Sequence, residues 1–354
     1  MLFLGIDQHA RQITVSLRDE SGDVLLARQV STHPKKINEF FQKLTRERLR
    51  DNESFTAVVE VCGFNDWLIR MLNDYRCEKV IVIQPDDRKK QKTDRRDAAA
   101  LSELLWVNRH RLLQGKPVRG LRQVDVSSTT DRENRRITTL RKEAGRRRTA
   151  LINRTKFILR RHNLMWNLPT KTFPTQRAIA WLKELVLPEV DRWELDHLLT
   201  DLEHIQKRIA ELEKILAERC ASSDEMKLIA TIPGVGAFTA TALACRVGRI
   251  ERFPRSHSLA NYWGLAPRCR DSGETRRPGS ITKAGSTIAR WLLAQMTRQV
   301  LRKDPQLREW FKRIKRRRGS SIARVAVMRK LATIIWHMLS KKKTYVECRA
   351  LSTA

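Results

Sequence analysis

The chain has 354 residues, a formal net charge of +32 and a hydrophobic fraction of 41%. This length and hydrophobic content predict about two or three domains with buried cores and exclude a disordered tail. No apolar stretch is long enough to span a bilayer, no signal peptide is recognisable, and the six cysteines form no CxxC pair. We therefore expect a protein of the reducing cytoplasm without a cysteine zinc site.

The positive charge is unevenly distributed along the chain. Residues 1–105 hold 18 Lys and Arg against 17 Asp and Glu, so nearly all of the excess lies in the remainder. A near-neutral module joined to a basic one is expected where metal-bound carboxylates must meet a polyanion, above all a nucleic acid. A basic protein that only coats nucleic acid is the simpler alternative, but a coat has no need of an acidic cluster.

The first hundred residues alternate between strand and helix patterns. Hydrophobic periodicity and turn residues predict strands at Leu2–Asp7, Ile13–Arg18, Asp23–Val30, Phe55–Glu60 and Lys79–Ile83, and helices at Pro34–Leu49, Asn65–Tyr75 and from Asp94 onward. Three strands, a helix and then alternating strands and helices are typical of the ribonuclease-H-like fold. We expect residues 1–105 to form an α/β catalytic domain of this RuvC-like class.

Residues 106–225 are predicted to be mainly helical. Asp131–Leu164 forms one long helix, with Arg146, Arg147 and Arg148 on a basic face. Apolar residues then follow at alternating steps of three and four, at Leu195, Leu198, Leu202, Ile205, Ile209, Leu212 and Leu216. This seam predicts a coiled coil, either within a helical hairpin or between two copies of the chain.

Four acidic residues stand out against this framework. Asp7 and Glu60 end two predicted strands, and Asp94 and Asp97 lie three apart on a predicted helix, so both face the same side. Taken singly, each has a simpler explanation, such as a turn residue, a surface charge or a helix cap. Together they are the hard oxygen ligands that Mg²⁺ or Mn²⁺ prefers, and such ions activate phosphodiesters for attack.

Residues 226–354 are expected to form a third, mainly helical domain that ends in a basic tail. Its segment 229–243, IATIPGVGAFTATAL, predicts a helix-hairpin-helix in which Gly234 and Gly236 let the backbone approach a phosphate. An ordinary glycine turn between packed helices is the alternative.

Residues 259–293 combine cations with serines. The cations are Arg268, Arg270, Arg276, Arg277, Lys283 and Arg290, and the serines are Ser272, Ser280 and Ser286. From composition alone Ser272 is a turn residue, and the segment holds no histidine that would take its proton. These residues by themselves do not select a nucleophile.

At these motifs the chain resembles the transposases of the insertion sequence one-ten family and the related Piv-type DNA invertases, nearly from end to end. GID with Asp7, VVEVCG with Glu60, and KTDRRDA with Asp94 and Asp97 match the DEDD tetrad of that family's RuvC-like domain. IPGVG, YWGLAP, DSG and ITKAG match its C-terminal transposase domain. One departure is Cys62 before a glycine, where the family often has a small residue or threonine; we do not expect it to damage the metal site.

The resemblance implies a DNA recombinase of an insertion sequence. Ser272 occupies the family's nucleophile position and would form a covalent phosphoserine link to DNA, assisted by Mg²⁺ or Mn²⁺ at the DEDD residues. The resemblance also implies donor and target double-stranded DNA, a structured guide or bridge RNA, and dimers that assemble into a tetramer, at the nucleoid of a bacterial cytoplasm. The alternative is a RuvC-like, metal-dependent junction endonuclease that uses water and forms no covalent intermediate.

Overall fold

The computed structural model describes residues 1–49, 53–84, 94–116, 118, 121–269 and 278–349, and it describes only the backbone of Asp94, Arg95, Cys269 and Pro278. Contacts divide the chain into two compact units, Met1–Val126 and Ser127–Ala354. We call them the N-terminal unit and the C-terminal unit. The three-domain division expected from the sequence, at residues 105 and 225, stays a prediction.

The N-terminal unit is a mixed sheet with helices on both faces. Its elements are β1 (Leu2–Gln8), β2 (Gln12–Arg18), β3 (Val24–Ser31), α1 (Pro34–Arg48), β4 (Phe55–Glu60), α2 (Asp66–Asp74), β5 (Cys77–Gln84), α3 (Asp94–Val107), α4 (Arg109–Leu113) and β6 (Arg122–Val124). Every strand and helix predicted for residues 1–105 is present, with small shifts at the ends. Strand β6 was not predicted, because three residues are too few for periodicity to reveal.

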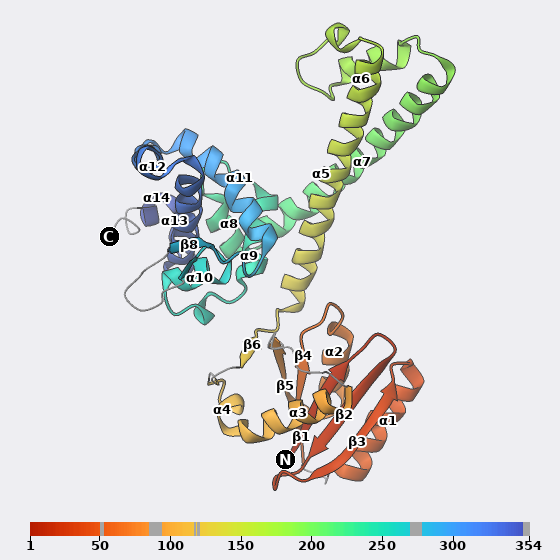
Figure 1. The fold of residues 1–354 in the computed structure, drawn as a ribbon, viewed down its shortest axis with the longest axis vertical. Helices are drawn as coiled ribbons and strands as arrows, with labels where there is room; N and C mark the ends of the chain where they lie inside the picture. Colours follow the sequence, from red (N-terminus) through yellow and green to blue (C-terminus); the bar gives the residue numbers. More distant parts are fainter. Residues whose placement is uncertain (50–52, 85–93, 117, 119–120, 270–277, 350–354) are drawn as a thin grey trace. The chain divides into compact units, whose positions relative to one another are not determined.

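The strands lie in the order β3-β2-β1-β4-β5-β6. Strands β1, β2 and β3 are antiparallel neighbours, β1, β4 and β5 are parallel, and β6 is antiparallel to β5. One face packs against α1 and α2 through residues such as Ile6, Val59 and Phe41, and the other packs against α3 through Val58 and Leu101 (Figure 1). Alternation along each strand decides which side chains meet which layer.

The C-terminal unit is mainly helical. Its elements are α5 (Thr129–Arg161), η1 (Met165–Asn167), α6 (Gln176–Glu184), α7 (Glu189–Ala221), α8 (Asp224–Ala230), α9 (Ala237–Val247), η2 (Ile250–Arg252), α10 (Ser256–Tyr262), β7 (Pro267–Cys269), β8 (Pro278–Ile281), α11 (Thr287–Lys303), α12 (Pro305–Arg318), α13 (Ser320–Lys341) and α14 (Tyr345–Arg349). The expected combination of an α/β sheet with a mainly helical remainder is confirmed.

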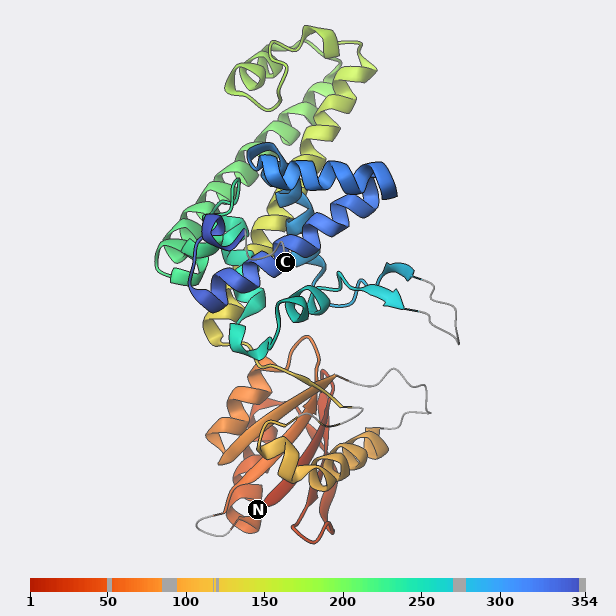
Figure 2. The same ribbon diagram turned by 90° about the vertical axis from the view of Figure 1, so that its left-hand side faces the viewer.

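Helices α5 and α7 form a long antiparallel hairpin with α6 at its far end (Figures 1 and 2). Arg154 Nε lies 2.7 Å from Glu194 Oε1, near the end opposite to where Arg219 pairs with Glu133. In the heptad seam the first three leucines and Leu216 are buried, whereas Ile205, Ile209 and Leu212 are only half buried. The hairpin form of the seam is therefore present, and its middle third retains apolar surface; whether it also joins two copies stays a prediction.

Helices α8 to α14 enclose a separate core around the fully buried Trp263 and Tyr345. Helix α13 lies centrally and packs against α10, α11, α12 and α14. No helix among the described residues is both long enough and apolar enough to cross a membrane.

Candidate functional site

Two of the predicted acidic ligands lie side by side at one edge of the sheet. Strands β1 and β4 are parallel and pair with Ile6 opposite Val59, so the next residues, Asp7 and Glu60, are neighbours across the strands. Val58, two residues before Glu60, is buried beneath α3. Because paired residues of a sheet point to the same side, Asp7 and Glu60 both project toward the α3 face.

Helix α3 lies directly on β1 because the strand has a glycine at that point. A Cβ on Gly5 would meet the carbonyl oxygen of Ala98 and the amide nitrogen of Ser102, each at 2.4 Å. The hydroxyls of Ser102 and Ser16 lie 2.9 Å apart and tie the same turn of the helix to β2. Any larger residue at position 5 would push away the helix that carries Asp97.

Helix α3 runs antiparallel to β1. Near the end of the helix, Trp106 Nε1 donates to the carbonyl oxygen of Glu20 over 2.9 Å, and the carboxylate of Glu20 pairs with the amino group of Met1 at 2.7 Å. The end of α3 thus lies at the beginning of β1, and its first turn, with Asp97, lies toward the carboxyl end of β1 and Asp7. The backbone of Asp94 belongs to the same first turn; its side chain lies outside the described ones.

The carboxylate of Asp7 has a neighbour that was not among the predicted residues. His9 Nε2 lies 3.0 Å from Asp7 Oδ2, just beyond the end of β1. The signal in the sequence is a histidine two positions after the aspartate, since such residues share one side of an extended chain. Among the described side chains, which exclude that of Asp94, no three His, Cys, Asp or Glu groups are close enough to hold a metal ion.

The chemistry of these donors fits a hard divalent cation. Asp7, Glu60 and Asp97 are all partly buried carboxylates, and they project from elements that converge at one sheet edge. Like charges in such a place repel each other, and a divalent cation would remove that repulsion. Oxygen donors of this kind suit Mg²⁺ or Mn²⁺ better than zinc.

A buried amide bridge fixes the spacing between the two strand ends. Asn65 Nδ2 donates to Gln8 Oε1 over 2.9 Å and to the carbonyl oxygen of Glu60 over 3.0 Å. The amide of Cys62 donates to Asn65 Oδ1 over 2.5 Å, so the residue that departs from the family pattern takes part through its backbone. Since Gln8 directly follows Asp7, the bridge joins the chain beside one acid to the turn beside the other. Asn65 was not among the predicted residues either.

The predicted turn between two helices is present from α8 to α9. Gly234 has a φ of +82°, and a Cβ on it would meet the Cβ of Gln299 on α11 at 2.6 Å, so helix packing alone requires this glycine. A Cβ on Gly236 would meet nothing within 4 Å among the described residues. Gly236 precedes the first turn of α9, and it is therefore the position in this turn with space for an approaching phosphate.

Two other glycines form the base of the β7–β8 hairpin. A Cβ on Gly264 would meet the carbonyl oxygen of Ala284 at 2.0 Å, and a Cβ on Gly285 would meet that of Tyr262 at 2.0 Å. Both glycines have positive φ, and so does Lys283, at +56°. The YWGLAP and ITKAG motifs therefore cross with backbone against backbone, which is possible only without side chains at these points.

Arg290, predicted as a phosphate contact, is bound to this crossing. Its Nη1 lies 3.0 Å from the carbonyl oxygen of Trp263, 3.1 Å from that of Ala284 and 3.2 Å from that of Gly285. These three oxygens share the two hydrogens of one nitrogen, so this side of the guanidinium is fully engaged with backbone. A positive charge in the sequence does not reveal whether its acceptor is a phosphate or a carbonyl oxygen.

The other predicted cations of this segment differ in what the structure describes. Arg268 and Lys283 are exposed at the base of the hairpin, and Arg268 Nη2 donates to the carbonyl oxygen of Thr282 over 3.1 Å. Arg270, Arg276 and Arg277 lie outside the described residues.

The three serines also differ. The hydroxyl of Ser286 accepts a hydrogen bond from the amide of Ala289 over 3.2 Å and caps α11, so it has a structural task. Ser280 is exposed on β8. Ser272 lies outside the described residues, between the two strands of the hairpin.

Six of the ten arginines of α5 fall into two groups. Arg141, Arg154 and Arg161 pair with carboxylates of α7 and hold the helical hairpin together. Arg146 and Arg147 are exposed and Arg148 is half buried, and in the described part of the chain no carboxylate lies within ion-pair distance of these three. This second group, Arg146, Arg147 and Arg148, was predicted to bind nucleic acid, and it remains available to a polyanion.

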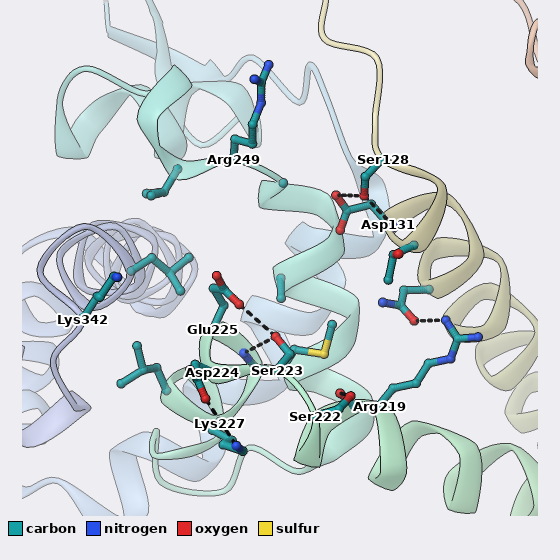
Figure 3. Close-up of a pocket in the computed structure, with 18 of the residues that line it drawn as sticks. Ser128, Asp131, Arg219, Ser222, Ser223, Asp224, Glu225, Lys227, Arg249 and Lys342 are labelled. Carbon is teal, nitrogen blue, oxygen red and sulfur yellow. Dashed lines mark hydrogen bonds and ion pairs between the residues drawn. The ribbon is translucent and has the colours of Figure 1, made fainter. Parts of the chain in front are cut away.

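A cavity of about 900 Å³ lies among the ends of α5, α7, α8, α9 and α13 (Figure 3). Some of its charged groups have partners within the cavity wall: Asp224 pairs with Lys227 at 3.3 Å, and Arg219 Nη1 donates to Asn134 Oδ1 over 2.9 Å. Acidic and basic residues both line it, so its wall does not favour a strongly charged ligand of either sign.

The fold and these sites define a class of protein: an enzyme with carboxylates at the edge of a mixed sheet, joined to a helical unit in which three consecutive arginines have no carboxylate partner among the described residues. Residues 4–164 match a family model of DEDD type whose description is transposase. Residues 226–312 match the family described as Transposase IS116/IS110/IS902 family. The chain belongs to this family of insertion sequence transposases, enzymes that recombine DNA.

Individual relatives agree with this assignment. A transposase for insertion sequence element IS1111A from Coxiella burnetii is 32% identical over 263 residues, which cover 73% of this chain and 69% of that protein. A probable family 20 transposase from Pseudomonas aeruginosa is 25% identical over 352 residues, 97% of this chain and 98% of that protein. The transposase for IS1328 from Yersinia enterocolitica is 30% identical over 171 residues, 45% of this chain and 51% of that protein.

Proposed function

We propose that this transposase cuts and rejoins double-stranded DNA at the ends of an insertion sequence through a covalent phosphoserine intermediate on Ser272. The observation that carries the proposal is the convergence at one sheet edge: Asp7 and Glu60 are neighbours on the face covered by α3, and the first turn of α3 brings Asp97 toward them. A strand order of three antiparallel strands followed by parallel ones supports a ribonuclease-H-like, RuvC-type domain.

Asp7, Glu60, Asp94 and Asp97 would hold the divalent cation, Mg²⁺ or Mn²⁺. When bound, it supplies charge that neutralises the carboxylates and polarises the scissile phosphate. The chain's own part is to hold these carboxylates at a fixed spacing, through the glycine contact beneath α3 and the amide bridge of Asn65.

The step assigned to Ser272 is a transfer between two oxygens. The serine Oγ attacks the phosphorus, the bond to the 3′ oxygen of the preceding nucleotide breaks, and the serine proton is balanced by the proton that the released 3′ hydroxyl takes up. A 3′ hydroxyl from another DNA end then attacks the phosphoserine, which restores the serine and joins the strands. No hydrolysis is needed, because each new phosphodiester replaces an old ester.

The nucleic-acid surface of this proposal comprises both glycines of the α8–α9 turn and several cations, namely Gly234, Gly236, Arg146, Arg147, Arg148, Arg268, Arg276, Arg277, Lys283 and Arg290. The structure supports them unequally. Gly236 and the three consecutive arginines of α5 are open to a ligand, whereas Gly234 and Arg290 already have structural partners. For Arg290 we therefore propose a positioning role, in which it holds the base of the hairpin that contains Ser272.

The family assignment also supports a guide or bridge RNA and an assembly of dimers into a tetramer as proposed partners. Apolar surface on the helical hairpin favours self-association: Trp166 and Val186 near its tip are 90% and 93% exposed, and the middle of the heptad seam is half exposed. An acidic site of one subunit would then act with the serine of another.

The decisive experiment is to trap the intermediate. Purified protein is incubated with labelled DNA carrying the element ends and Mg²⁺, denatured, and separated by electrophoresis under conditions that keep a phosphoserine ester intact. We expect DNA linked by its 5′ end to the wild-type protein and to a Ser280→Ala control, and none with Ser272→Ala. Cleaved DNA without any linked protein would overturn the serine step and favour the junction endonuclease that uses water.

A further inference from the structure

A second, smaller cavity of about 210 Å³ lies between α12, α13 and α14. Its charged lining consists of Asp304, Arg313, Lys330 and Arg349, and its aromatic lining of Trp310 and Tyr345. Three cations thus face one carboxylate. None of these residues belongs to the acidic site or to the β7–β8 hairpin.

The single carboxylate is already fully engaged. Asp304 is 3% exposed, and its Oδ1 accepts the amide of Leu307 over 3.0 Å, which caps the start of α12. Its Oδ2 accepts the hydroxyl of Tyr345 over 2.8 Å and lies 3.7 Å from Arg349 Nη1. Asp304 thus pairs with Arg349, and among the described residues it lies beyond ion-pair distance of the other two cations of the cavity.

Both cations line the same cavity, where Lys330 is half buried and Arg313 is exposed. Lys330 Nζ lies 4.8 Å above the ring of Trp310. Burial lowers the pKa of Lys330; the charge of Asp304 opposes this shift, and the charge of Arg313 adds to it. Within the described residues, no carboxylate lies within ion-pair distance of Lys330 or Arg313. Two like charges at a partly desolvated cavity destabilise the empty site, and an anion between them would relieve this.

We propose that this cavity binds one phosphate group of a nucleic-acid backbone, between Arg313 and Lys330. Helix α12 continues from the cavity with the exposed basic residues Lys315, Arg316, Arg317 and Arg318, so a strand that entered the cavity would be followed by further cations. DNA and RNA share the phosphodiester that this site would recognise. The inference rests on the proposed function only in taking nucleic acid as the ligand.

The test uses full-length protein with Lys330→Gln, Arg313→Gln or the control Lys312→Gln. Lys312 is on the same helix but pairs with Glu309 at 2.8 Å, so its replacement removes the same charge outside the cavity. Affinity for labelled duplex DNA and for single-stranded RNA is measured over a range of salt concentrations without divalent cation. Loss of one phosphate contact should make the slope of log K against log salt less steep by about 0.9 for duplex DNA or about 0.7 for a single strand.

Thermal unfolding separates binding from structure. If the cations exist to bind phosphate, Lys330→Gln should leave the melting temperature close to that of the wild type. The variant removes repulsion from Arg313 and the burial of a charge, and this offsets the lost contact with Trp310 and the lost attraction to Asp304. A smaller slope with DNA only, RNA only or both supports the proposal and identifies the source of the phosphate. Slopes equal to that of Lys312→Gln with both nucleic acids would overturn it, and so would a lower melting temperature without a change in slope. Neither of these results affects the experiment that traps DNA on Ser272, so the two proposals are tested independently.

Discussion

The two units place their functional groups by different physical means. In the N-terminal unit, Asp7 and Glu60 are placed by strand pairing, and a single glycine, Gly5, lets a regular helix settle on the sheet. In the C-terminal unit, the base of the β7–β8 hairpin has no regular element to position it. Its position is set instead by the left-handed conformations of Gly264 and Gly285 and by the guanidinium of Arg290, which binds carbonyl oxygens. A strand or helix is held by many similar hydrogen bonds and packing contacts, so the loss of one changes its position little. A crossing of two turns has few contacts and depends on each of them.

The largest effect is expected from removing an acid whose place is set by regular structure. Asp97→Ala should reduce strand cleavage and transfer by more than about a thousandfold, since a divalent cation contributes several kcal/mol of charge stabilisation in such reactions. DNA binding and the melting temperature should stay near wild type. The rates are measured with labelled element ends and Mg²⁺.

Asp74→Ala is the matched control, because it removes an exposed carboxylate from α2 of the same unit. It should leave cleavage unchanged. Normal cleavage by Asp97→Ala would remove this residue from the metal site and would show that adjacency at the sheet edge does not reflect catalysis.

The second largest effect is expected at the crossing of the two turns. Gly264→Ala should lower the free energy of unfolding by more than about 3 kcal/mol, because it combines backbone strain with a 2.0 Å contact to a carbonyl oxygen. Gly319→Ala has strain without a contact and should cost about 1 to 3 kcal/mol, and Gly236→Ala has neither and should stay within about 0.5 kcal/mol. Denaturant unfolding of the three variants measures this order. Equal costs at Gly264 and Gly319 would mean that the hairpin base can shift to make room.

The acidic residues of the N-terminal unit and the crossing of the two turns show how far the sequence determines the site. A short apolar run predicted the strand that ends at Glu60 to the residue, and the helical pattern from Asp94 onward placed Asp94 and Asp97 in one helix. The patterns of strands and helices involve only a few neighbouring residues, so they can be recognised in a single sequence. That Asp7 and Glu60 lie opposite each other depends on the pairing of distant strands, and it was expected only from the order of the elements and from the resemblance to a family.

What the sequence could not predict is the partner of a charge. Arg290 lies in a segment rich in Arg, Gly and Ser, which is the composition of a phosphate site, but its guanidinium is bound to three carbonyl oxygens. Gly234 matches a phosphate-binding turn, but α11 occupies the space beside it. Trp263 lies 27 residues from Arg290, and the helix beside Gly234 is also distant in sequence. Ala284 and Gly285 are near Arg290 in sequence, but their carbonyl oxygens reach it only through the left-handed turn at Gly285. The local pattern therefore indicates the residue type and does not indicate what the residue contacts.

A smaller effect is expected from the bridge between the strand ends. Asn65→Ala removes two donated hydrogen bonds and one accepted bond near Glu60, but no metal ligand. We expect about a tenfold weaker affinity for Mn²⁺, in the lower range for residues that orient metal ligands. Titration of the protein with Mn²⁺ measures this by calorimetry, independently of catalysis. Asn38→Ala, which removes an exposed asparagine that accepts a bond from Tyr75, is the control. Unchanged affinity in Asn65→Ala would show that the sheet alone fixes the spacing of the acids.

The smallest effect is expected at the tip of the helical hairpin. There, ion pairs hold the helices in position, as strand pairing holds the acids in the N-terminal unit. A hydrogen bond from His162 holds the pKa of Asp191 below its ordinary value, burial opposes this, and Arg161 lowers it further. Because the pKa is lowered on folding, this carboxylate stabilises the protein above its ordinary value of about 3.9, and the contribution is lost as the pH falls through the lowered value. Asp191→Asn should therefore melt slightly below wild type at neutral pH, and this deficit should shrink as the pH falls below about 3.9. The exposed Asp196→Asn, on the next turn, should differ less at neutral pH. A deficit of Asp191→Asn that persists unchanged in acid would mean that its hydrogen bonds, and not its charge, stabilise the tip.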